Sequence, residues 1–168
     1  MSVAILNKTS VVSVGASLFV PTVTARDLYE VVLNVRGFPR WAPGVRRVEV
    51  LEGAGGPGMV SEWEVSVLGL RRKISSVLEE TEPPTLLRWT YDGVVQGWGE
   101  CTIRDRGYGV LAEFRTELSP AEPVLEKLMR TSAAKSTAAC HLKRSLVRLG
   151  RIVSGDGNVR VGPLERAG

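Results

Sequence analysis

The chain has 168 residues and a mass of 18.2 kDa, with 43% hydrophobic and 24% charged residues, which is typical of one globular domain with a sizeable core. Its net charge of +4 comes from 22 basic and 18 acidic residues. The basic residues are spread along the chain without a tract of five or more, so no nucleic-acid partner is predicted.

The first part of the chain is predicted to form a strand, a helix and three more strands. After an N-terminal extension, residues 1–10, the first strand covers residues 11–20. Thr24 and Asp27 form a capping-box pattern, and apolar residues then recur at helical spacing until Gly37, so a helix is predicted between them. Alternation and turn signals predict the next strands over residues 45–52, 59–67 and 71–80.

The segment that follows the helix, residues 36–44, contains two prolines and two glycines. These residues exclude a continued helix and a central strand. Phe38 and Trp41 are nevertheless large apolar side chains that a folded domain buries. We therefore expect this loop to dock on the rest of the domain through its two aromatic side chains.

The second part of the chain changes from strands to one long helix. Strands are predicted over residues 85–91, 94–104 and 110–118, the first two joined by a hairpin at Asp92-Gly93. The apolar period then becomes helical over residues 120–153. The Gly-rich, charged tail, residues 154–168, is predicted to be disordered. This order predicts an α+β fold in which an antiparallel sheet curls around the last helix.

The predicted inward side of the last helix is bulky at both ends and small or weakly polar in the middle. Its members are Leu125, Leu128, Met129, Ser132, Ser136, Ala139, Cys140, Lys143, Leu146 and Val147. Small residues on such a face indicate either close packing on the sheet or an enclosed cavity. Inward polar residues on the strands, among them Ser61 and Thr116, favour the cavity. The predicted cavity lies between Met129, Ser132 and Ser136 of the helix and Trp63, Ser76 and Phe114 of the strands.

The order of elements, the segment Phe38-Pro-Arg-Trp41 and the long C-terminal helix resemble the START-like superfamily, in particular its branch of polyketide cyclase/dehydrase and coenzyme-Q-binding domains. The resemblance covers roughly residues 11–151, and the START-like domain is predicted over residues 11–153. It implies a helix-grip fold, in which a curved antiparallel sheet of about seven strands wraps around the last helix and encloses a deep hydrophobic cavity. It also implies binding or transport of a lipid, a quinone or a polyketide-like molecule. The alternatives are an aromatic polyketide cyclase or dehydratase, and a module that recruits a membrane or a partner protein.

The hairpin between strands 85–91 and 94–104 determines which of their residues face the cavity. If Tyr91 and Val94 flank the turn, one face carries Leu87, Trp89, Tyr91, Gln96, Trp98 and Glu100, and the other carries Leu86, Arg88, Thr90, Gly97, Gly99, Cys101 and Ile103. Apolar bulk favours the first set inside, whereas the resemblance favours the second. We adopt the second set, which directs Arg88 at the ligand; the alternative for Arg88 is an ordinary surface arginine.

No catalytic residue is predicted. His141 has no second histidine or acid at metal or triad spacing, and Glu62 and Glu64 lie opposite the predicted core face. The resemblance implies that cyclases of the family use an arginine on the strand that corresponds to residues 71–80. The inward positions of that strand are here Ile74, Ser76 and Leu78, with Arg72 at its start. Binding of a hydrophobic molecule is therefore favoured over catalysis.

The predicted ligand-binding residues are Trp41, Trp63, Ser76, Arg88, Cys101, Phe114, Met129, Ser132 and Ser136. We expect the loop of residues 36–44 to rim the cavity mouth, with Trp41 against the last helix. Four arginines, Arg36, Arg40, Arg46 and Arg47, would surround that mouth and make transient contact with an anionic membrane surface. A loop that only caps the first helix is the alternative.

Neither cysteine has metal or redox spacing, so Cys101 and Cys140 are expected to be buried, reduced thiols, and no metal or cofactor is predicted. The first residues lack the pattern of a signal peptide. No apolar run approaches the roughly 20 residues of a membrane-spanning helix. A cytoplasmic location is predicted.

Overall fold

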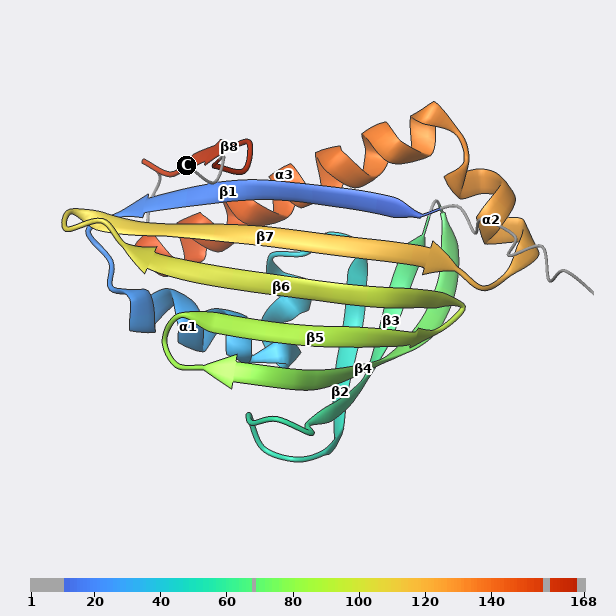
Figure 1. Ribbon diagram of the computed structural model, residues 1–168, viewed down its shortest axis with the longest axis horizontal. Helices are drawn as coiled ribbons and strands as arrows, with labels where there is room; N and C mark the ends of the chain where they lie inside the picture. The colour runs from blue at the N-terminus through green and yellow to red at the C-terminus, as the bar shows by residue number, and fades with distance from the viewer. Residues whose placement is uncertain (1–10, 68, 156–157, 166–168) are drawn as a thin grey trace, which may run out of the picture.

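The computed structural model describes residues 11–67, 69–155 and 158–165, so the predicted extension, residues 1–10, lies outside the described residues. One antiparallel sheet has the order β2-β3-β4-β5-β6-β7-β1-β8. Its strands are β1 Val12–Pro21, β2 Val45–Glu52, β3 Val60–Val67, β4 Leu70–Glu82, β5 Leu86–Gly93, β6 Val95–Asp105, β7 Gly109–Pro120 and β8 Arg160–Gly162. The sheet curves strongly, with the last long helix along β1 (Figure 1). The predicted α+β helix-grip arrangement is confirmed.

The first helix, α1 (Ala25–Leu33), begins at the predicted capping box. The amide of Asp27 donates to Thr24 Oγ1 at 3.2 Å, and the amide of Thr24 donates to Asp27 Oδ2 at 2.9 Å. The helix ends at Leu33 rather than near Gly37, and a 3-10 helix, η1 (Val35–Arg40), follows directly. The loop is therefore partly helical, because its prolines and glycines are compatible with this short, tight form.

The C-terminal helix is broken, which corrects the prediction of one continuous helix. It consists of α2 (Pro123–Met129) and α3 (Ser132–Ser154). Thr131 starts the second helix, since its Oγ1 accepts from the amide of Ala134 at 3.1 Å. The break rotates α3 relative to a continuous helix. Among the described residues, no helix combines the length and hydropathy needed to cross a bilayer.

Part of the predicted disordered tail is ordered, and it supplies the eighth strand. Strand β8 pairs with the middle of β1, where Val161 lies opposite Leu18. Val159 packs so closely on Gly150 of α3 that a side chain at that glycine would overlap it. Sequence composition suggested disorder because the apolar residues of the tail are few, but Val161 pairs with Leu18 and Leu164 packs on Gly15 of β1. The other tail residues, 156–157 and 166–168, lie outside the described residues.

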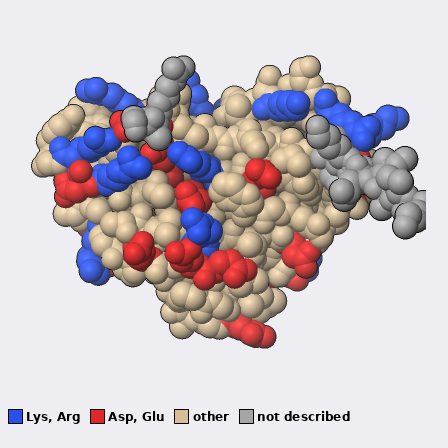
Figure 2. Space-filling model, in the orientation of Figure 1, with Lys and Arg blue, Asp and Glu red and all other residues tan. Residues whose placement is uncertain are grey.

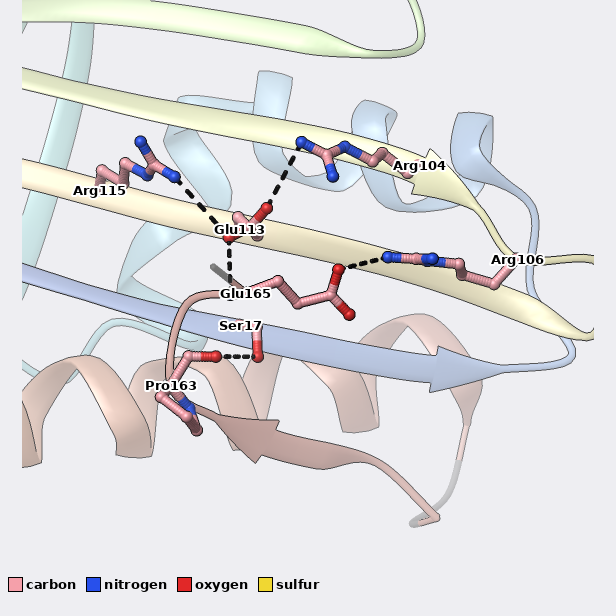
Figure 3. A network of polar contacts seen from close by, with 7 residues as sticks. All are labelled: Ser17, Arg104, Arg106, Glu113, Arg115, Pro163 and Glu165. Carbon is pink, nitrogen blue, oxygen red and sulfur yellow. Dashed lines mark hydrogen bonds and ion pairs between the residues drawn. The ribbon is translucent and has the colours of Figure 1, made fainter. Parts of the chain in front are cut away.

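Polar contacts hold the end of the tail on the outer side of the sheet (Figure 3). Ser17 Oγ donates to the carbonyl of Pro163 at 2.8 Å, and the amide of Glu165 donates to Glu113 Oε2 at 3.2 Å. Glu113 is only 4% exposed, and Arg104 and Arg115 approach its carboxylate to 3.6 and 3.9 Å. The tail thus completes the coordination of a buried carboxylate.

Candidate ligand-binding cavity

A cavity of about 320 Å³ lies between the sheet and α3. The loop after η1 and the end of β3 also contribute to its wall. Four predicted residues line it: Trp41, Trp63, Phe114 and Met129. Its size is at the lower end of the range of small-molecule sites, and its wall is mainly aliphatic and aromatic.

An aromatic cluster forms the part of the wall nearest to η1. The ring of Phe38 lies 4.2 Å from that of Trp41 and 4.7 Å from that of Trp63, measured between centroids. All three side chains are buried, as expected for the two in the loop. Trp41 also borders a hollow that is lined in part by Ile152 and Val153 of α3. The cluster packs η1 against the sheet.

Trp63 separates the main cavity from a small space of about 20 Å³. Its Nε1 donates to Ser61 Oγ at 2.7 Å, in a fully buried position. Ser76, directly opposite Ser61 on β4, lines this small space and not the main cavity. Ser76 is thus inward, as predicted, but lies behind Trp63 when seen from the main cavity.

The pairing of β5 with β6 differs from both predicted alternatives. Tyr91 lies opposite Gly97, three positions from the Tyr91–Val94 pairing of a two-residue turn. Because the shift is by an odd number of residues, residues of β5 and β6 that were predicted to lie on opposite faces of the sheet now share one face. Trp89 and Tyr91 of the first set line the cavity, while Cys101 of the second set is fully buried beside Phe114.

The adopted orientation of Arg88 is therefore wrong. Its guanidinium lies on the outer face of the sheet, where it donates to Glu80 at 2.6 Å and to Glu100 at 2.6 and 3.0 Å. Cys101 points inward but does not line the main cavity. The second cysteine, Cys140, is exposed, which corrects its predicted burial.

Tyr91 belongs to a continuous chain of hydrogen bonds along the wall. Trp89 Nε1 donates to the phenol oxygen of Tyr91, which also bonds the side chain of Thr116. Thr116 Oγ1 in turn donates to the carbonyl of Trp98 at 2.9 Å. Burial raises the pKa of Tyr91 to about 12. Tyr91 is a neutral, internally bonded group here, unsuited to act as a general base.

The face that α3 turns to the cavity is not the predicted one. Ser132 and Ser136 are exposed and do not line it. The break at Thr131 brings a different set inward, Ala134, Thr137, Ala138, His141, Leu142 and Ser145. Small residues therefore do face the cavity, but at other positions. The capping pattern at Thr131 is the sequence signal that could have identified them.

His141 is the functional candidate that sequence reasoning passed over. It lines the cavity from α3, close to Gly44 of the loop after η1. Arg72, the other charged residue considered, does not line the cavity: its guanidinium forms two bonds with Glu122, at 2.9 and 2.8 Å. In the described ranges, no three histidine, cysteine or acidic side chains lie close enough together to hold a metal ion.

Comparison with known proteins supports this description of the fold. Residues 12–153 match the family described as "Polyketide cyclase / dehydrase and lipid transport". A search of curated proteins found no match.

Three solved structures illustrate the similarity in fold. TTHA0849 from Thermus thermophilus has a TM-score of 0.72 and 17% identity, over 85% of this chain and 97% of that one. The Zhui aromatase/cyclase from Streptomyces sp. R1128 has a TM-score of 0.62 and 18% identity, over 88% and 92%. A START superfamily protein from Mycobacterium smegmatis has a TM-score of 0.59 and 13% identity, over 79% and 97%. Because the family match covers most of the chain, the protein belongs to the polyketide cyclase / dehydrase and lipid transport family.

Proposed function

We propose that this protein binds and carries a hydrophobic small molecule, a lipid, a quinone or a polyketide-like compound, in the cavity between the sheet and α3. The observation that carries the proposal is the cavity itself, about 320 Å³ in volume and walled mainly by apolar side chains. Its polar fixtures are few, which is the usual composition of a site for an apolar ligand.

The two arginines that a cyclase or dehydratase could use form ion pairs outside the cavity. Arg72 is bonded to Glu122, and Arg88 is bonded to Glu80 and Glu100 on the outer face. The indole N–H of Trp89 and the hydroxyl of Thr116 donate to other protein groups, and the phenol oxygen of Tyr91 accepts from Trp89. These groups shape the wall and present little unsatisfied polarity to a ligand, which favours binding over acid–base chemistry.

A matched pair of substitutions on α3 tests the proposal. Ala138→Leu adds bulk on the cavity side, whereas Ser136→Leu adds the same side chain on the exposed side. We expect Ala138→Leu to weaken uptake of the neutral fluorescent probe N-phenyl-1-naphthylamine and Ser136→Leu to leave it unchanged. Equal binding by wild type and both variants, all folded, would show that the probe does not enter this cavity. Native mass spectrometry of protein purified from its own host would then identify the carried molecule.

A cyclase or dehydratase is the second candidate, and His141 is the observation that favours it. It is a titratable side chain in the cavity wall, and a proton donor or acceptor there could assist ring closure or loss of water. His141→Ala separates the two functions: a carrier keeps its ligand affinity, and an enzyme loses turnover of a bound polyketide-like substrate.

A further inference from the structure

The charge of this chain is divided unequally between its last helices and the rest. The segment from Lys127 to Ser154, which covers the last three residues of α2 and all of α3, contains seven basic residues and no acidic residue. The rest of the chain contains the other 15 basic residues and all 18 acidic ones. The net positive charge of the protein therefore resides on the helices that close the cavity, and the remainder is net negative.

Five of these basic residues form what we call the cationic face of α3: Lys135, Lys143, Arg144, Arg148 and Arg151. All five are exposed. Within the part of the chain that the structure describes, none of them forms an ion pair or a side-chain hydrogen bond. Elsewhere arginines are commonly paired, as Arg72, Arg88 and Arg106 are. The cationic face therefore produces a positive electrostatic potential that no acidic side chain of the described residues neutralises by direct pairing.

The surface beside this face carries exposed apolar groups. Val124 and Leu128 of α2 are 55% and 36% exposed, and Lys127 lies between them in the sequence. Apart from Lys135, the exposed residues of α3 near α2 are small, including Ser136 and Ala139. Basic side chains are visible over α2 and the neighbouring part of α3, whereas basic and acidic side chains are interspersed over the strands (Figure 2).

We propose that the outer side of α2 and α3 docks on a membrane surface that contains anionic lipids. The helix α3, which has 23 residues and is about 34 Å long, distributes its basic residues over its exposed side, which suits a flat and diffuse layer of negative charge. Val124 and Leu128 suit the interfacial region of a bilayer, whereas a nucleic-acid backbone offers them no apolar contact. The opposite side of α3 lines the cavity, so docking brings the cavity wall next to the lipid surface.

The test compares two triple variants that remove the same charge. Lys143→Gln/Arg144→Gln/Arg151→Gln changes the cationic face, and Arg36→Gln/Arg40→Gln/Arg46→Gln changes the loop near η1. Sedimentation with phosphatidylcholine vesicles, with and without phosphatidylserine, gives the affinities at low salt and at 0.15 M or above, where the screening length is about 8 Å. Each basic residue near an anionic surface contributes about fivefold, so the α3 variant should bind roughly 100-fold more weakly.

The expected result is binding of wild type only to vesicles with phosphatidylserine, weakened by salt, with the loop variant retaining most of that affinity. The proposal is overturned if wild type fails to bind vesicles with phosphatidylserine at low salt. The same conclusion follows if both variants lose the same vesicle affinity, or if the loop variant loses more affinity than the α3 variant. It is also overturned if a short DNA duplex binds more tightly than the anionic vesicles. Circular dichroism checks that the variants fold. Uptake of N-phenyl-1-naphthylamine by the same variants reports on the cavity separately, so failure of either proposal leaves the other measurable.

Discussion

The indole of Trp89 lies directly over Gly99, its partner on the neighbouring strand β6. A methyl group at Gly99 would overlap atoms of that indole, so only glycine allows the ring to lie flat against the sheet here. This contact determines the position of Trp89 Nε1 and hence its bond to Tyr91. A backbone position without a side chain thus shapes the cavity wall.

Gly99→Ala is therefore expected to push Trp89 into the cavity and break its bond to Tyr91. Uptake of N-phenyl-1-naphthylamine should fall several-fold, and the tryptophan emission should change. Gly56→Ala is the control, because nothing lies within 4 Å of a side chain at that position. Unchanged probe binding in Gly99→Ala would mean that Trp89 does not define the usable volume.

Trp41 and Trp63 are each 4% exposed, but only Trp63 has a partner for its indole N–H. Among the described residues, Trp41 Nε1 is a buried donor without one. Trp63→Phe removes a buried hydrogen bond and leaves the Ser61 hydroxyl without this partner. It should therefore lower the free energy of unfolding by about 1–3 kcal/mol more than Trp41→Phe does. Urea unfolding followed by circular dichroism measures the difference. Equal losses would indicate that the N–H of Trp41 is satisfied in solution.

Tyr91 should make the free energy of unfolding decrease at alkaline pH. Burial raises the pKa of Tyr91 from 10.0 to about 12, so between these values the unfolded chain loses the phenol proton and the folded chain keeps it. The stabilisation is present below pH 10 and is lost as the pH rises to 12, by about 1 kcal/mol at about pH 11. Burial also raises the pKa of Cys101 above 9.0, which acts in the same direction.

The test is to measure how steeply the free energy of unfolding changes with pH in wild type and in two variants. Tyr91→Phe should be less sensitive between about pH 8 and about pH 11 than wild type, even though it loses a hydrogen bond at all pH values. Tyr108→Phe, at a tyrosine that is 73% exposed, is the matched control and should keep the slope of wild type. A parallel decline in wild type and Tyr91→Phe would contradict the assignment.

Arg72 and Glu122 should be energetically coupled. Their two hydrogen bonds join β4 to the start of α2, and this contact lowers the pKa of Glu122. The coupling should be present above the ordinary value of 4.5 and be lost as the pH falls through the lowered pKa. A double-mutant cycle with alanine measures it. The more exposed pair Lys73–Glu62 should give a smaller coupling that disappears in high salt.

Local patterns were enough to predict most of the fold. Strict alternation placed Phe114 and Thr116 on one face of β7, and the Thr24 capping box located α1. The register of β5 and β6 could not be predicted, because it depends on positive φ angles at Gly93, where β5 ends, and at Gly97 of β6, which is paired with Tyr91. Nor does any proline or glycine mark the break before Thr131, which moved Ser132 and Ser136 away from the cavity.

The short strand β8 has a consequence for how this domain meets other chains. By pairing with Ser17–Phe19 it occupies part of the otherwise free edge of β1. The opposite edge, β2, has register irregularities at Val45/Arg47 and at Val50/Glu52, and several of its side chains are charged and exposed. Straight, uncharged edges attract foreign strands, and both edges here depart from that description. A curved sheet that holds an apolar hollow open can thereby avoid edge-to-edge aggregation with its own copies.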